Sequence, residues 1–449
     1  ASIRHDISPA FPKDHNSYWY PSVSGSFIFS NLLKSNVLSF GKLRSSFAIA
    51  GADLAPYETV MGYVTGNVYK TTTNTVTTGY VPDKLKNPGI KPSFANSFEV
   101  GTDLKFLKNR IGIDFTYYKQ RNKNQIIDLS VSGGSGFTSF VVNAGDIQNQ
   151  GIEVSLNANP VASKLFQWNT ILNFARNKSR INELYPGINV YQLDANVYSS
   201  QTVYLNATVG KEFGSLVGPG YARDASGQLL LGADNMPVQE LNKDFGSVVP
   251  ELTGGFVNNF KIGKFDVAAM IDFQKGGQFF SWSKMLAVKS GQAAETVVLN
   301  DKGMNVREPL ANGGGVRMTG IYAPGTMITI AGVPTNVGGQ NFDGYVDARA
   351  YFRNKIGTQI YEEWLYDASY IKLREVSVGY TFDKDLIKKL PVKSVRLSAI
   401  ARNPLMIWQK APKGLDPSEL SSGSASISWI EKGELQTVRS YGVNLNVIF

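Results

Sequence analysis

The last nine residues of the chain alternate apolar side chains with small or polar ones at a period of two. The apolar positions are Tyr441, Val443, Leu445, Val447 and Phe449. The positions between them are small or polar, with Ile448 as the exception. Because successive side chains of a strand point to opposite faces, this segment predicts a strand with one apolar and one polar face. Such a strand can cross a bilayer in a barrel, and a half-buried strand of a soluble sheet has the same pattern.

The clearest predicted hairpin lies between residues 98 and 117. Phe98–Leu107 alternates apolar side chains and one Thr against polar or small ones. After a tight turn, Ile111–Tyr117 repeats this pattern, with Phe115 on the apolar face and Asp114 on the polar face. Two alternating runs joined by a short turn predict an antiparallel pair.

Similar runs recur along the whole chain and predict roughly eleven strands of about 8 to 12 residues, the length that a tilted strand needs to cross a bilayer. The predicted strands are Val23–Leu33, Leu43–Ala50, Phe98–Leu107, Ile111–Tyr117, Gly151–Ala158, Trp168–Phe174, Leu252–Phe260, Phe265–Phe273, Tyr370–Phe382, Val395–Ala401 and Tyr441–Phe449.

The connections between these strands alternate between short and long. The long ones are Gly51–Asn96, Gln120–Asn149, Arg176–Pro250, Gln274–Ser369 and Arg402–Gly433. Short turns on one rim and long loops on the other are typical of outer-membrane barrels. The pattern therefore favours an all-β, transmembrane antiparallel β-barrel with long extracellular loops and short periplasmic turns.

The number of predicted strands bears on how such a barrel closes. An open sheet in lipid would leave unsatisfied amides at both edges, and bacterial barrels normally close with an even number of strands. Roughly eleven strands therefore predict that further strands, from outside this chain, complete the cylinder.

Composition excludes some classes of protein and leaves others open. No stretch approaches the roughly 18 consecutive apolar residues of a membrane-spanning helix. The net charge of +9 comes from dispersed Lys and Arg residues, which favours solvated turns over a nucleic-acid partner. Cysteine is absent. The chain begins at Ala1 without an initiator Met or a signal peptide, so we expect it to be a processed or partial chain.

The sequence offers little that predicts catalysis, a cofactor or a metal site. The two histidines, His5 and His15, lack a cysteine or clustered carboxylates at metal-ligand spacing. Glu362 and Glu363 are adjacent, and neighbouring side chains of an extended segment point to opposite faces, which argues against a glycosidase pair. We expect no enzyme, no cofactor and no metal.

Several segments, taken together, resemble the C-terminal barrel half of SusC-like TonB-dependent transporters. They span the chain from about Tyr20 to the C-terminus, and none is specific alone. The segments are Tyr20–Phe27, Leu38–Phe47, Ser97–Asp103, Asn109–Tyr118, Asn143–Gly145, Asn149–Val154 and Ala368–Tyr380.

The resemblance implies an outer-membrane importer of Bacteroidetes-type Gram-negative bacteria with a barrel of about 22 strands. In that register, residues 1–449 supply about the last 11 strands, and the plug and the first barrel half lie outside this chain. The implied partners are that N-terminal half, a SusD-like surface lipoprotein that acts as a lid, the TonB complex and outer-membrane lipid. The implied cargo is an oligosaccharide or a peptide, and the family gives the terminal strand, ending at Phe449, a role in barrel assembly.

Aromatic residues in the predicted loops are candidates for contact with substrate or lid. They are Phe279, Phe280 and Trp282 just beyond one strand, and Trp408 and Trp429 in the last long loop. Simple packing of the loops explains these side chains equally well. Two other functions stay open: a passive porin or structural surface barrel, and a soluble β-rich carbohydrate-binding protein or enzyme.

Overall fold

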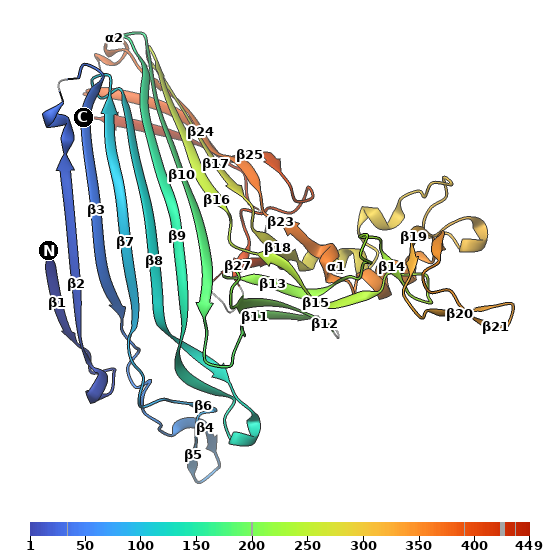
Figure 1. The fold of residues 1–449 in the computed structure, drawn as a ribbon. Coiled ribbons are helices and arrows are strands. Elements are labelled where there is room, and N and C mark those ends of the chain that lie inside the picture. Colours follow the sequence, from blue (N-terminus) through green and yellow to red (C-terminus); the bar gives the residue numbers. More distant parts are fainter. Residues whose placement is uncertain (34, 199–200, 390, 423–426, 436) are drawn as a thin grey trace.

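The computed structural model is dominated by one large curved sheet with folded loops at one end (Figure 1). The structure describes residues 1–449 except 34, 199–200, 390, 423–426 and 436. The described residues form a 13-stranded sheet, in which β6 (Lys84–Leu85) only flanks β9. The other strands, in spatial order, are β1 (Ser2–Ile7), β2 (Ser17–Ile28), β3 (Leu38–Ala52), β7 (Ser93–Phe106), β8 (Ile111–Ser130), β9 (Ser139–Ala162), β10 (Phe166–Glu183), β16 (Leu252–Ile262), β17 (Phe265–Lys275), β24 (Tyr370–Thr381), β25 (Ser394–Gln409) and β28 (Ser440–Ile448).

Neighbours along this path pair antiparallel, as predicted, and every predicted strand lies on it. One further strand, β1, was not predicted. Its Ile3 and Ile7 alternate with polar residues, but a six-residue run with only two aliphatic side chains is a weak signal. Within the described residues, β1 and β28 each pair with a single neighbour, so the sheet has two open edges.

Several predicted boundaries were wrong. The strand predicted at Val23–Leu33 ends at Ile28, where the 3₁₀ turn η2 (Phe29–Leu32) begins. The long loop predicted at Gln120–Asn149 shrinks to residues 131–138, because β8 and β9 continue pairing through it. The cause of this second miss is that backbone pairing with a neighbour extends a strand past the point where its side chains stop alternating.

The register keeps apolar side chains together on one face of the sheet. Phe115 lies opposite Thr102 and Val154, while Asp114 lies opposite Asp103 and Ser155. The terminal strand continues this arrangement, since Leu445 lies opposite Leu397 and Val443 opposite Ala399. Val443 is 76% exposed, so in this chain no protein covers the apolar face there.

Strand β8 shows where the apolar band ends. Its outward positions are apolar from Ile111 to Tyr117 and then become Lys119, Arg121 and Lys123 on the same face. Charged side chains are costly against hydrocarbon and stable in water. The outer parts of β8 and β9 therefore project beyond the apolar band.

The two rims of the sheet differ as the alternation of loop lengths predicts. The helix α2 (Lys384–Ile387), the C-terminus and the short turns lie at one end of the sheet in Figure 1. In the turn between β7 and β8, Leu107, Lys108 and Asn109 all have positive φ, which closes the chain within four residues. Among the described residues, no helix is long and apolar enough to cross a membrane.

The long connections fold into smaller elements at the opposite end. Between β3 and β7 lie β4 (Val64–Lys70) and β5 (Thr75–Tyr80), and between β10 and β16 lie β11 (Val190–Tyr198), β12 (Gln201–Thr208), β13 (Ser215–Tyr221), β14 (Leu230–Leu231) and β15 (Gln239–Ser247). Between β17 and β24 lie β18 (Gln278–Ser281), α1 (Trp282–Lys289), η4 (Ala294–Val297), η5 (Leu310–Asn312), β19 (Val316–Tyr322), β20 (Met327–Ile330), β21 (Val333–Asn336), β22 (Asn341–Val346), the π-helical η6 (Ala350–Ile356), η7 (Tyr361–Trp364) and β23 (Leu365–Asp367). The last loop carries β26 (Ser421–Ser422) and β27 (Ser428–Glu431), and the short 3₁₀ turns η1 (Lys13–His15) and η3 (Gly133–Ser135) complete the set.

The buried apolar side chains of the described residues gather in these loops and in the strand ends beside them. The main cluster joins three separate connections. Leu205 and Leu216 come from the connection between β10 and β16, Phe280 and Trp364 from that between β17 and β24, and Trp429 from that between β25 and β28. A soluble sandwich would instead bury one face along the middle of its strands. We name residues 184–251, 276–369 and 410–439 the loop assembly, because they share this core.

Candidate functional site

The polar face of the sheet carries arginine and carboxylate side chains that pair across strands. The pairs are Arg44–Asp114, Arg374–Asp272, Arg396–Asp266 and Arg402–Glu375. In a closed barrel this face lines the lumen, where water and polar groups replace lipid. The pairs keep the charges of the polar face locally balanced.

Two of these pairs cross an intervening strand above a glycine. Arg44 reaches over β7 to Asp114, with Nη1–Oδ2 and Nη2–Oδ1 distances of 2.8 and 2.7 Å. A Cβ at Gly101 of β7 would lie 2.8 Å from Arg44 Nε, so a larger residue would displace the guanidinium. Arg396 passes over Gly379 of β24 toward Asp266 in the same way. The two glycines thus leave room for bridges across three strands.

The structure places three of the five predicted contact residues in the interior of the loop assembly. Phe279 and Phe280 are 0% exposed and Trp429 is 1% exposed. Trp429 also donates its Nε1 hydrogen to Asp194 Oδ2 at 2.9 Å. Side chains that are covered on all sides cannot reach a ligand in this conformation, so of the two interpretations, packing applies to these three residues.

The other two predicted contact residues lie in different environments. Trp282 begins α1 and packs, half-buried, against the main core cluster. Trp408 was predicted in a loop, which is wrong, because β25 continues to Gln409. Trp408 pairs with Ile371 on the apolar face and is 49% exposed. An exposed indole at the end of an apolar band is typical of the aromatic belt at a membrane interface.

The two glutamates that resemble a glycosidase pair have separate partners. They lie on the 3₁₀ turn η7 rather than on the extended segment that the prediction assumed. Glu362 accepts hydrogen bonds from Lys243 Nζ and from the backbone of Tyr221, while Glu363 accepts one from the Tyr221 hydroxyl. Both carboxylates therefore help to join β13 and β15 to the connection between β17 and β24.

The two histidines show no metal-ligand geometry in the part of the chain that the structure describes. His5 stacks on Trp19 with ring centroids 4.3 Å apart, and its Nε2 lies 2.7 Å from Ser17 Oγ. No group of three or more His, Asp or Glu side chains among the described residues is arranged to hold a metal ion.

A buried lysine ties the last long loop to the sheet. Lys372 of β24 is 3% exposed, and its ammonium group has three oxygen partners from that loop. The partners are Asp416 Oδ2 at 2.7 Å, Ser418 Oγ at 2.9 Å and Thr437 Oγ1 at 3.1 Å. An ammonium group has three donors, so all of them are satisfied here. No local pattern in the sequence predicts this anchor, because the partners of Lys372 lie 44 to 65 residues away along the chain.

The carboxyl of Asp416 is stabilised as an anion by this arrangement. Burial opposes its ionisation, but hydrogen bonds from Lys372, Thr437 and Ser418 outweigh that effect and lower the pKa of Asp416 below its ordinary 3.8. A lowered folded-state pKa contributes stability above the unfolded-state pKa, and this contribution is lost as the pH falls through the folded-state value.

We therefore expect the attachment of the last loop to be constant from neutral pH to about pH 5 and to weaken below about pH 4. The measurement is tryptophan fluorescence of the purified protein across this range, with thermal unfolding at each pH. A Lys372→Met variant is the control, because it lacks the anchor at every pH. If the variant shows the same acid transition as the wild type, the transition does not come from Asp416.

Two curated proteins are similar to this chain over nearly all of its length. TonB-dependent receptor P3 of Formosa agariphila is 24% identical over 477 residues, which cover 100% of this chain and 43% of that protein. TonB-dependent receptor SusC of Bacteroides thetaiotaomicron is 23% identical over 442 residues, which cover 94% of this chain and 40% of that protein. The chain thus spans less than half the length of these relatives.

A solved structure has the same fold. The RagAB peptide importer in its closed-closed state matches with a TM-score of 0.71 at 18% identity, over 99% of this chain and 45% of the other. The match extends through the loops as well as the sheet, since nearly all of the present chain is covered. A transmembrane antiparallel barrel, of which this chain is a part, is therefore confirmed as the fold.

The family model described as "TonB dependent receptor-like, beta-barrel" matches residues 1–266, which is more than half of the chain. The curated relatives and the structural match agree with that family, and they include SusC, as the resemblance implied. The chain belongs to the TonB-dependent receptor-like β-barrel family of Gram-negative outer-membrane proteins.

Proposed function

We propose that residues 1–449 are the C-terminal barrel half of a SusC-like transporter that imports a nutrient. The observation that carries the proposal is the large antiparallel sheet, which keeps one face apolar and ends in two open edges, β1 and β28. Unpaired edges in lipid are costly, so strands from the rest of the transporter would complete the cylinder. The chain's share of its relatives, 40% to 45%, supports the same division.

The proposed partners follow from the relatives. A SusD-like surface lipoprotein would act as a lid over the loop assembly, and the plug of the N-terminal half would connect the barrel to the TonB complex. The solved relative is named a peptide importer and another relative is SusC, which supports an oligosaccharide or a peptide as cargo. No catalytic role is assigned, and the transported molecule would be moved without covalent change.

The experiment uses the full-length transporter in its native outer membrane. Affinity purification should recover a surface lipoprotein, and uptake of labelled oligosaccharides or peptides should stop when TonB is inactivated. Uptake that continues at the same rate without TonB would favour the passive porin. A native protein that is monodisperse in buffer without detergent would contradict the membrane assignment itself.

The terminal strand provides a test of the assembly role. Deleting Phe449 is expected to lower the amount of transporter in the outer membrane, because its exposed ring directly follows β28, the edge strand that must meet the rest of the barrel. Burial of one such side chain contributes roughly 1.5 to 3 kcal/mol. The measurement is the amount of protein at the cell surface. Leu435→Ser, at a loop position that is 95% exposed, is the control, and equal surface levels in the two variants would refute the role.

A further inference from the structure

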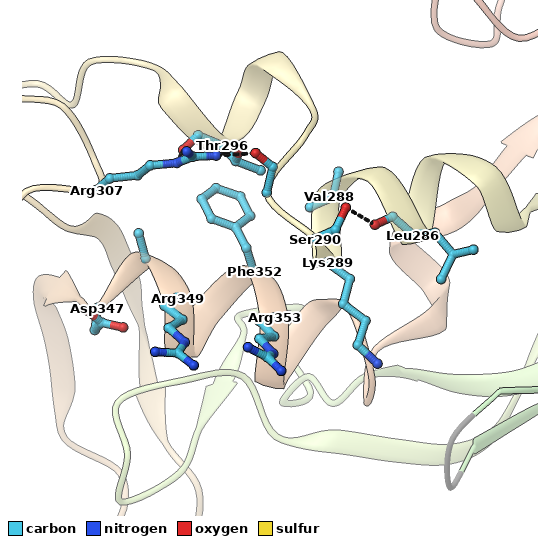
Figure 2. Close-up of a pocket in the computed structure, with 12 residues that line it drawn as sticks. Leu286, Val288, Lys289, Ser290, Thr296, Arg307, Asp347, Arg349, Phe352 and Arg353 are labelled. Carbon is cyan, nitrogen blue, oxygen red and sulfur yellow. Dashed lines mark hydrogen bonds between the residues drawn. The ribbon is translucent and has the colours of Figure 1, made fainter.

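A cavity of about 650 Å³ lies in the loop assembly, and its lining residues all come from the connection between β17 and β24. It is bounded by the end of α1, by the segment that contains η4, and by η6 with the residues just before it (Figure 2). We name it the loop cavity. Its volume lies within the usual range for sites of small ligands, about 300 to 1,000 Å³.

The lining of the loop cavity is strongly basic. Its charged side chains are Lys289, Arg307, Arg349, Arg353 and a single acid, Asp347. The carboxylate of Asp347 accepts a hydrogen bond from the backbone of Ala350 at 2.8 Å and so begins η6. Among the described residues, none of the three arginines forms an ion pair with a carboxylate. Basic groups elsewhere in the loop assembly that do so are Lys243, Lys284, Arg317, Lys355 and Lys410. The cavity therefore holds uncompensated positive charge.

Arg307 is held in place without being neutralised. Its Nε donates to the carbonyl of Thr296 at 2.7 Å and its Nη2 donates to the Thr296 hydroxyl at 2.6 Å, with a further contact to the carbonyl of Gly291. Thr296 is itself 1% exposed, so its backbone provides a rigid support. Neutral acceptors fix the guanidinium and leave its charge available to an anion.

Arg349 and Arg353 form a second basic element. They are four residues apart on the helical segment of η6, and both are exposed. Figure 2 shows that the two guanidinium groups and the Lys289 ammonium group point to the same side of the segment. Side chains at this spacing are neighbours on one helix face. Two planar guanidinium groups side by side can each bind a carboxylate or sulfate with two hydrogen bonds.

An apolar surface accompanies these charges. Phe352 points to the opposite side of η6, toward Arg307 and Thr296, and Leu286 and Val288 of α1 complete the lining. One way in which extended peptides bind is to add a strand to a sheet edge, but none of the residues that line this cavity lies in a strand. Fixed side-chain donors beside an aromatic face suit a ring-shaped ligand that carries an anionic group.

We propose that the loop cavity binds the acidic groups of an anionic oligosaccharide, which would make such a sugar the cargo. This rests on the proposed function as an importer. On one side of η6, Arg307 binds the carboxylate or sulfate of a sugar unit and Phe352 contacts the ring of that unit. On the other side, Arg349 and Arg353 bind the acidic group of a further unit of the same chain. A neutral oligosaccharide of the same length lacks these contacts and binds more weakly.

The test measures binding to the purified full-length transporter by calorimetry, with three probes of similar length: oligogalacturonate, a neutral malto-oligosaccharide and oligoglutamate. The double variant Arg349→Gln/Arg353→Gln removes two charges that have no ion-pair partner among the described residues, so its folding should match the wild type, as thermal unfolding will check. We expect oligogalacturonate binding to weaken at least about tenfold in this variant, and to weaken with added salt in the wild type. The control, Arg223→Gln/Lys413→Gln, removes two exposed charges elsewhere in the loop assembly and should bind normally.

Three results would overturn the inference. They are equal affinity for the acidic and the neutral sugar, equal affinity of the double variant and the wild type, and preferential binding of oligoglutamate, which would assign the cavity to acidic peptides. None of these results would affect the proposal that the protein is an importer, because TonB-dependent uptake is measured separately.

Discussion

Replacing Lys372 by methionine is expected to lower the free energy of unfolding by about 3 to 5 kcal/mol, the usual cost of removing one partner of a buried ion pair. Methionine keeps most of the volume but leaves the Asp416 carboxylate, 18% exposed, without its cation. Ser418 and Thr437 lose the same partner. The measurement is equilibrium unfolding of the full-length protein in lipid vesicles, together with protease digestion of the last loop, which should become faster.

Two further variants separate the anchor from a general effect of lost charge. Lys410 pairs with Asp367 at 2.7 Å but is 61% exposed, so Lys410→Met should change stability by less than about 1 kcal/mol. Adding Asp416→Leu to Lys372→Met removes the unpaired carboxylate and should recover part of the loss. If Lys372→Met and Lys410→Met have equal effects, Lys372 is not an anchor.

Replacing Phe115 by arginine is expected to block insertion of the barrel. Phe115 lies on the apolar face within the band that ends near Tyr117, and a cation on the lipid face costs roughly 2 to 4 kcal/mol at the middle of the membrane. The measurement is the fraction of protein that is folded in the outer membrane. The heat-dependent shift in electrophoretic mobility that folded barrels show gives this fraction.

The neighbouring residue provides a matched control. Asp114 points to the polar face and pairs with Arg44, and both side chains are more than a third exposed. Asp114→Asn weakens that pair, but a partly hydrated pair contributes at most about 1 kcal/mol, so insertion should continue. Equal effects of the two variants on insertion would mean that the assigned facing of the strand is wrong.

The Lys372 anchor and the main core cluster hold the loop assembly in position. Lys372 fixes the last loop to the outer part of β24, and the main core cluster joins that loop to the two preceding connections. The described parts of these three connections are therefore joined into one folded body at the ends of the strands. Such a body can present a cavity of defined shape, as the proposed binding of an acidic sugar requires.

The sequence by itself determined the large sheet and the orientation of its faces. Alternation at a period of two is a local property, so the facing of Phe115, Asp114 and the terminal strand was evident without coordinates. The sequence could not determine where β8 and β9 end. Backbone pairing between the two strands holds their outer parts, and these parts carry charges on the face that is apolar from Ile111 to Tyr117.

Only the tertiary structure decided the role of the loop residues. From the sequence, Phe280 and Trp429 are both predicted to lie in loops, where they could contact a ligand. Both are buried in the structure, because segments more than a hundred residues apart meet around them. The loop cavity is similar: Lys289, Arg307 and Arg353 match no motif. They meet only because α1 packs against η6 and because Arg307 is tied to Thr296 of η4 beside them. The face of the sheet to which a side chain points follows from its local position in the strand. The burial of a side chain and the clustering of charges depend on which distant segments of the chain come into contact.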